Sequence, residues 1–147
     1  MLSDRTAAVL PVIGRLGLAS LFILGGIKKA LNYQSTLERM SDVGLTPASL
    51  LLPATIALEL IGGACVVYGR RPAAFAALAL FVFTLATNYW FHRFWELDGE
   101  IAALELSLFF KNVAIAGGLL LLVRELSSQG SDPEQPSGGH QRNFPSA

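Results

Sequence analysis

Four apolar segments, each about as long as a bilayer is thick, constrain the fold of this chain more than any other feature. They run over residues 7–29, 48–68, 72–91 and 101–123. The hydrocarbon core of a bilayer is about 30 Å thick and an α-helix rises about 1.5 Å per residue, so a span needs roughly 20 mostly apolar residues. The sequence therefore predicts an all-α polytopic membrane protein, a bundle of four transmembrane helices forming one domain over residues 1–126.

The composition excludes several other classes of protein. Of the 147 residues, 52% are hydrophobic and 15% are charged, and the mean hydropathy is +0.50. The 11 basic and 11 acidic residues balance, so we expect no nucleic-acid partner. The single cysteine, Cys65, excludes an intrachain disulfide, a CxxC redox pair and a cysteine-rich metal site. With only two histidines, His92 and His140, we expect no metal site and no bis-histidine haem.

The two ends of the chain differ in character. Residues 127–147 are rich in Pro, Gly, Ser and Gln and cannot bury a core, so they are predicted to form a disordered cytoplasmic tail. The first apolar segment could instead be a secretory signal. It carries Arg15 internally and is followed by Lys28 and Lys29, with no cleavage site of small residues, so we interpret it as an uncleaved span.

The connections on the other side are predicted to lie in the membrane interface. Ser35, with Glu38 three residues later, matches a capping box, so a short interfacial helix is expected between the first two spans. Thr46 and Pro47 then resemble the N-cap and first-turn proline of the second span. Residues 88–99, NYWFHRFWELDG, have the composition of an aromatic belt.

Basic residues in short loops predict the orientation. Arg70 and Arg71 join the second and third spans, Arg5 precedes the first span and Arg124 follows the fourth. The positive-inside rule then places both termini in the cytoplasm. The basic residues on the opposite side are interleaved with acidic ones.

Three charged residues, Arg15, Glu59 and Lys111, lie inside predicted spans. Each would cost roughly 2.5–3.5 kcal/mol at the bilayer centre, so they should face inward and find partners. Glu59 and Lys111 lie at matching depths, roughly 14 and 15 Å from the outer end, and have opposite signs, which predicts a Glu59–Lys111 ion pair. Arg15 lies in the cytoplasmic half, where it can snorkel or bind carbonyls. Whether the pair is functional or structural stays open.

Two further features surround these charges. Gly62 and Gly63 share the helical face of Glu59, and small residues of this kind let helices approach closely. His92 and Asn88 are one helical turn apart at the outer interface. An interfacial histidine usually serves as an anchor, but the two residues form a second candidate ligand site.

Four stretches of the chain, from about Arg15 to Leu122, together resemble the DoxX family of bacterial membrane proteins. They are RLGLASLFILGGIKK, LERMSDVGLTP, ALELIGGACVVYGRR and FFKNVAIAGGLLLL. The positions that carry the resemblance are Arg15, Lys28 or Lys29, Glu59 with Gly62 and Gly63, and Lys111 with Asn112.

The resemblance implies a four-helix protein of the bacterial inner membrane. The family is associated with thiosulfate:quinone oxidoreductase subunits and with complexes that handle thiol or oxidative stress. This implies a redox-linked subunit, with other membrane or redox subunits as partners. It would bind a quinone or a small sulfur compound where Lys111 and Asn112 donate hydrogen bonds and Glu59 relays a proton.

Two alternatives remain: a scaffold subunit without chemistry of its own, and a small solute transporter, which four spans would form most readily as a homo-oligomer. The sequence leaves open whether the chain catalyses a reaction alone.

Overall fold

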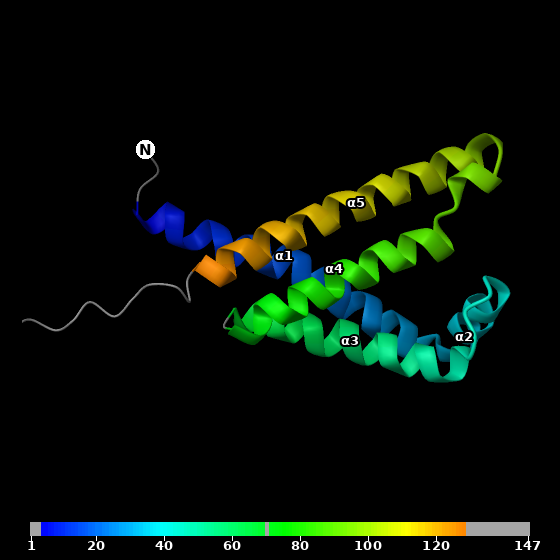
Figure 1. The fold of residues 1–147 in the computed structure, drawn as a ribbon, viewed down its shortest axis with the longest axis horizontal. Coiled ribbons are helices and arrows are strands. Elements are labelled where there is room, and N and C mark those ends of the chain that lie inside the picture. Colours follow the sequence, from blue (N-terminus) through cyan, green and yellow to red (C-terminus); the bar gives the residue numbers. More distant parts are fainter. Residues whose placement is uncertain (1–3, 70, 129–147) are drawn as a thin grey trace, which may run out of the picture.

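A computed structural model describes residues 4–69 and 71–128 of the chain. The predicted tail lies outside the described residues from residue 129 onward. The helices, in chain order, are α1 (Asp4–Leu31), α2 (Tyr33–Asp42), α3 (Ala48–Tyr68), α4 (Arg71–Phe91), the 3₁₀ helix η1 (Phe94–Glu96) and α5 (Gly99–Ser128) (Figure 1).

The described part of the chain is helical and contains no strand, which confirms the all-α prediction. By length and composition, α1, α3, α4 and α5 are long and apolar enough to cross a membrane. The short helix α2 stands between the first two of them, as predicted. Helix α5, at 30 residues, is about 45 Å long, which exceeds the thickness of a hydrocarbon core.

The long helices pack as two pairs. Helix α1 packs along α3 and α4 packs along α5, while α3 also contacts α4. Figure 1 shows the two pairs close together where α1 begins and α5 ends, and farther apart toward α2 and η1. The main apolar core lies at the converging end and consists of Ala19, Phe22, Val66, Ala73, Ala77, Leu80, Leu119, Leu122 and Leu126.

Glycines bring α1 and α3 into close contact. A Cβ atom on Gly63 would lie 2.7 Å from Cγ1 of Ile23, and one on Gly26 would lie 2.9 Å from Cγ of Leu60. Real side chains do not approach this closely, so neither position has room for a larger residue without movement of its neighbour. The prediction that small residues beside Glu59 allow close helix packing is confirmed.

Helix α2 lies over the diverging end. Its buried Met40 packs with Ala48 and Leu52 of α3 in a second apolar cluster, which Phe91 at the end of α4 also contacts. Gly44, with φ of 83°, turns the chain from α2 toward α3. These contacts fix α2 on the α1–α3 pair, with Phe91 of α4 at the edge of the cluster.

Two predicted helix starts differ from the structure. The capping box at Ser35 and Glu38 is wrong: α2 already begins at Tyr33, because α1 ends only two residues earlier and the chain turns at Asn32. The Ser35 hydroxyl donates to the Asn32 carbonyl and so lies within the first turn. Pro47 is itself the N-cap of α3, in an extended conformation, so Thr46 is not the cap.

Candidate functional site

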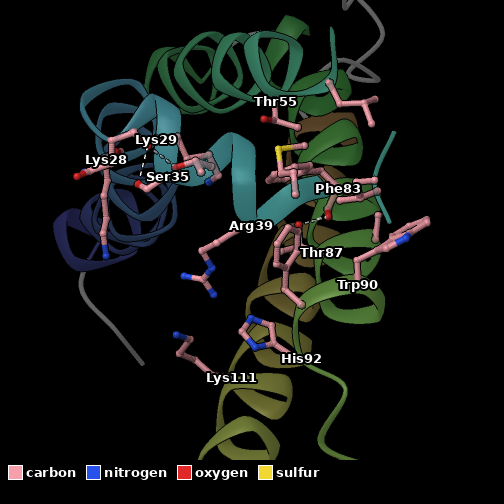
Figure 2. A pocket seen from close by; sticks show the side chains of 18 residues that line it. Lys28, Lys29, Ser35, Arg39, Thr55, Phe83, Thr87, Trp90, His92 and Lys111 are labelled. Carbon is pink, nitrogen blue, oxygen red and sulfur yellow. Dashed lines mark hydrogen bonds between the residues drawn. The ribbon is translucent and has the colours of Figure 1, made fainter. Parts of the chain in front are cut away.

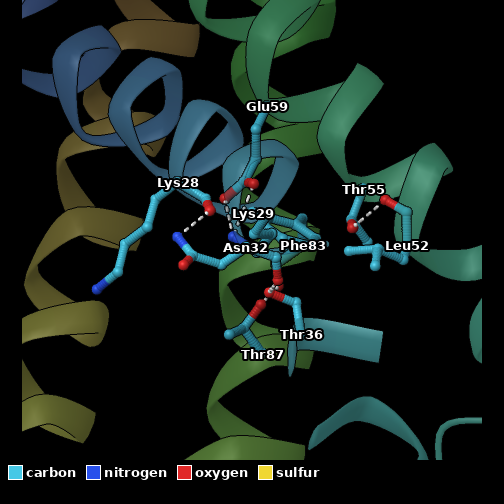
Figure 3. Close-up of polar contacts among 9 residues, drawn as sticks. All are labelled: Lys28, Lys29, Asn32, Thr36, Leu52, Thr55, Glu59, Phe83 and Thr87. Carbon is cyan, nitrogen blue, oxygen red and sulfur yellow. Dashed lines mark hydrogen bonds and ion pairs between the residues drawn. The ribbon is translucent and has the colours of Figure 1, made fainter. Parts of the chain in front are cut away.

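An ion pair joins α1 to α3 at the diverging end. The Lys29 ammonium donates to both carboxylate oxygens of Glu59, at 2.8 and 2.7 Å (Figure 3). The Glu59 side chain is 5% exposed and that of Lys29 is 29% exposed. Gly25 allows the approach, since a Cβ there would lie 3.0 Å from Oε1 of Glu59. The ammonium also lies 5.9 Å from the centre of the Phe83 ring, within cation–π range.

The predicted Glu59–Lys111 pair is wrong, because Lys29 holds both oxygens of the carboxylate. Matching depth is not sufficient for pairing: the two helices must also be neighbours. Helix α3 packs against α1 and α4, whereas α5 packs against α4 and touches α1. Lys29, in the last turn of α1, is therefore the cation that lies beside Glu59.

A cavity of about 870 Å³ opens where the two helix pairs diverge. Four basic side chains line it: Lys28 and Lys29 from α1, Arg39 from α2 and Lys111 from α5. Figure 2 shows the nitrogen ends of Lys28, Arg39 and Lys111 around the same open space. None of the described residues that line the cavity is acidic. We call this space the basic cavity.

The rest of the lining is apolar or already hydrogen-bonded. The apolar members are Met40, Leu45, Leu51, Phe83, Ala86, Trp90 and Phe91. Among the hydroxyl groups, Thr55 donates to the Leu52 carbonyl and Thr87 donates to the Phe83 carbonyl. These hydroxyls are satisfied within their own helices and keep lone pairs that can accept a bond from a ligand.

His92, predicted to share a ligand site with Asn88, lines the basic cavity, but Asn88 is not among its lining residues. The Nδ1 atom of His92 lies 2.7 Å from Oε2 of Glu105 on α5. Asn88 is 3% exposed and donates to the Phe109 carbonyl of α5, while its Oδ1 accepts a bond from Asn112 at 2.9 Å. Asn88 and Asn112 therefore join α4 to α5.

Arg15 lies at the opposite end of the bundle, away from the basic cavity. Its guanidinium donates to the Gly69 carbonyl at the end of α3, at 3.3 Å. This agrees with the expectation that Arg15 binds carbonyls in its own half of the bundle.

Sequence reasoning missed Arg39 as a cavity residue, because it is one of several basic and acidic residues scattered over the outer connections. A signal was present in the spacing. Ser35, Thr36, Arg39 and Met40 recur at intervals of three and four residues, so they share one face of α2, and all four line the basic cavity. Met40 packs against α3 and so orients that face of α2. Arg39 lies on the same face and is therefore directed into the cavity.

Comparison with known proteins places the chain in a family. The model of the DoxX family matches residues 10–93, which include α2, α3, α4 and most of α1. The inner membrane protein YphA of Escherichia coli K12 is 30% identical over 114 residues, which cover 78% of this chain and 81% of the relative. The inner membrane protein YqjF of the same strain is 34% identical over 115 residues, which cover 76% and 79%. No solved structure matches the chain. The chain belongs to the DoxX family.

Proposed function

We propose that this chain is an integral protein of the bacterial inner membrane that binds an anionic ligand in the basic cavity, as a subunit of a redox-linked complex. The observation that carries the proposal is the lining itself: four basic side chains from three helices, with no acidic residue among the described lining residues. The four long apolar helices and the names of both relatives support the membrane location. The family resemblance supports the redox link.

Within residues 4–69 and 71–128, an ion pair offsets one of the four positive charges in the cavity. Glu59 neutralises Lys29, whereas no ion pair within the described chain joins Lys28, Arg39 or Lys111 to an acidic residue. Like charges that converge repel one another, and they repel more strongly where the surrounding dielectric constant is low. A bound anion would relieve this repulsion and gain charge-assisted hydrogen bonds from two or three helices.

The redox hypothesis assigns these residues specific roles. Lys111 and Arg39 would donate hydrogen bonds to a sulfur oxyanion or to the carbonyl oxygens of a quinone, whose ring would pack against Phe83 and Trp90. Glu59, the proposed proton relay, does not line the cavity. It is hydrogen-bonded to Lys29, and Lys29 does line the cavity. A proton that reaches the ligand from Glu59 would therefore pass through Lys29.

We propose that both termini face the cytoplasm, following the positive-inside rule. The first described residues of α1 and the last of α5 lie at one end of the bundle, and α2 lies at the other (Figure 1). In this orientation the basic cavity faces the outer side of the membrane. The ligand would then be taken up from the periplasm or from the outer leaflet.

Tryptophan fluorescence tests the ligand site, because Trp90 lines the cavity. Purified protein in a non-ionic detergent is titrated with thiosulfate and, separately, with a short-chain quinone. Loss of a hydrogen bond to a charged group costs about 1.5–3 kcal/mol, so Lys111→Met should weaken binding by roughly 10- to 100-fold. Arg124→Met, which removes a cation from the other end of α5, is the matched control. Equal titrations of the wild type and Lys111→Met would overturn the cavity assignment.

An accessory subunit without chemistry of its own is the second candidate function. It is favoured by the complete satisfaction of buried groups: among the described residues, every buried side-chain nitrogen and oxygen has a hydrogen-bond partner. On this hypothesis Lys29 and Glu59 only fasten α1 to α3. Co-purification in mild detergent identifies the partner subunits, and the Lys29→Met/Glu59→Gln double variant then separates the two functions. An intact complex with full activity would show the pair to be structural, whereas an intact complex without activity would show that it takes part in the reaction.

A further inference from the structure

We propose that the ligand of the basic cavity is a phosphate-headed lipid drawn from the bilayer, with its headgroup among the cations and an apolar chain along the opposite wall. This rests on the proposed function, since it takes the basic cavity as the ligand site. It goes further by naming the class of molecule that fills the cavity.

The size of the cavity indicates a large ligand. Its volume of about 870 Å³ lies near the upper end of the roughly 300–1,000 Å³ typical of pockets for drug-sized molecules. A water molecule occupies about 30 Å³ of liquid volume, and a small inorganic anion occupies only a few times as much. Such an anion alone would leave the apolar lining in contact with water.

The lining is divided into a charged side and an apolar side. Lys28, Arg39 and Lys111 come from α1, α2 and α5, whereas Phe83 and Trp90 come from α4 and stand across the cavity from them (Figure 2). An amphiphile matches this division. A neutral quinone would fit the apolar wall but would leave three cations without a counter-ion.

The charge of Lys29 is consistent with this division into a charged side and an apolar side. It is the cation beside the apolar wall, 5.9 Å from the Phe83 ring centre, and it is also the one that Glu59 neutralises. The protein thus cancels the charge that would otherwise lie next to an apolar chain. In the described part of the chain, no ion pair joins an acidic residue to Lys28, Arg39 or Lys111, which surround the open space.

The three remaining cations favour phosphate over a carboxylate headgroup. The planar fork of the Arg39 guanidinium can bind two oxygens of one phosphate, while lysines act as point charges around it. A phosphate monoester carries a charge of about −1.5 to −2 at neutral pH, whereas a carboxylate carries one negative charge. A phosphate group therefore offsets more of the charge supplied by three basic residues.

On this proposal the lipid enters the cavity from the bilayer between α1 and α5. Leu18 of α1 lies beside Gly118 of α5 near the converging end, and the two helices diverge from there (Figure 1). Leu24 on α1 and Phe110 on α5 are 64% and 59% exposed in the diverging half. Apolar side chains exposed on both helices would let a lipid chain pass between them without contact with water.

Quenching of Trp90 by brominated lipid tests the inference. The sequence contains two tryptophans, Trp90 and Trp95. Trp95 is replaced by phenylalanine, so that the fluorescence comes from Trp90. The protein is reconstituted in phosphatidylcholine that contains a minor fraction of phosphatidic acid with brominated chains. The reference uses the same fraction of brominated phosphatidylcholine. Brominated phosphatidic acid is expected to quench Trp90 at a concentration about tenfold lower than brominated phosphatidylcholine does. A tenfold difference in affinity is about the contribution of one hydrogen bond to a charged group.

Variants and competitors make the test specific. Arg39→Gln, and independently Lys111→Gln on another helix, should raise the half-quenching fraction of phosphatidic acid toward that of phosphatidylcholine. Arg93→Gln is the matched control, because Arg93 lies at the same end, pairs with Glu96 and does not line the cavity. Equal quenching by the two brominated lipids, or an equal effect of Arg39→Gln and Arg93→Gln, would overturn the inference.

A soluble headgroup separates this inference from the proposed function. Glycerol 3-phosphate should not displace the brominated lipid, since it lacks the chain, and displacement would show that the headgroup alone suffices. If thiosulfate titrates the wild type but not Lys111→Met, while phosphatidic acid shows no preference, the lipid inference fails and the anion site stands. If neither probe depends on Lys111, both fail.

Discussion

Replacing Lys29 by methionine probes the buried ion pair with little change in side-chain volume. Both Glu59 oxygens lose their donor, and a side chain that is 5% exposed cannot recover bonds from water. Removing one partner from a buried pair costs about 3–5 kcal/mol in soluble proteins. Insertion scales give roughly 2.5–3.5 kcal/mol for an unpaired charge at mid-membrane. We therefore expect Lys29→Met to lower the free energy of unfolding by about 3 kcal/mol.

The reciprocal variant should cost less. Glu59→Gln leaves Lys29 without its acceptor, but the lysine is 29% exposed in the last turn of α1 and can turn its ammonium toward the interface. We expect a loss of about 1 kcal/mol. In the double variant no unpaired carboxylate remains, so the loss should fall below the sum of the two single losses by about 2 kcal/mol. Lys28→Met is the control, since Lys28 is exposed and its loss should not lower the stability.

Unfolding in mixed micelles titrated with sodium dodecyl sulfate measures these free energies. A second cycle, on Glu59→Gln and Lys111→Met, should show no coupling, because α3 and α5 are not neighbours. Coupling of Glu59 to Lys111, or a Lys29→Met variant as stable as Lys28→Met, would refute the pairing.

Two further predictions concern helix contacts away from the cavity. Gly63→Leu should lower the free energy of unfolding by about 1–3 kcal/mol or more, because even a Cβ there would lie 2.7 Å from Ile23. Gly17→Leu, at a glycine with no neighbour within 4 Å, should have little effect in the same titration, and equal losses would contradict the close α1–α3 contact. Asn88→Ala should cost about 1–2 kcal/mol, since it breaks the bond from Asn112 that joins α4 to α5. Adding Asn112→Ala should cost little more, and fully additive losses in a double-mutant cycle would count against that bond.

The sequence predicted the all-α fold and the short helix between the first two spans because both follow from local properties. Twenty apolar residues in a row favour a membrane span whatever lies beside them. The inward position of Glu59 was predictable for a similar reason, since a charge inside a span must find a partner. Its burial at 4% exposure follows from that requirement and from the glycines on its own helical face.

The identity of that partner was not predictable from a single sequence. Lys29 and Lys111 carry the same charge, and counting residues gives depth along one axis only. The choice between them depends on which helices are adjacent. Adjacency depends on how closely the helix surfaces can pack, and Gly26 and Gly63 allow α1 to approach α3. Arg39 was missed for the same reason, because its place in the cavity depends on how α2 packs onto α3.

The basic cavity follows from how the interhelical polar bonds are distributed. The Lys29–Glu59 pair joins α1 to α3, and the Asn88–Asn112 bond joins α4 to α5, so each strengthens one helix pair. Where the pairs converge, apolar packing joins them, and where they diverge, α2 packs on the α1–α3 pair. The residues that hold the pairs are thus largely distinct from Arg39 and the other cations that face the open space. Substitutions in the first group should change stability, and those in the second should change binding while leaving the helix pairs intact.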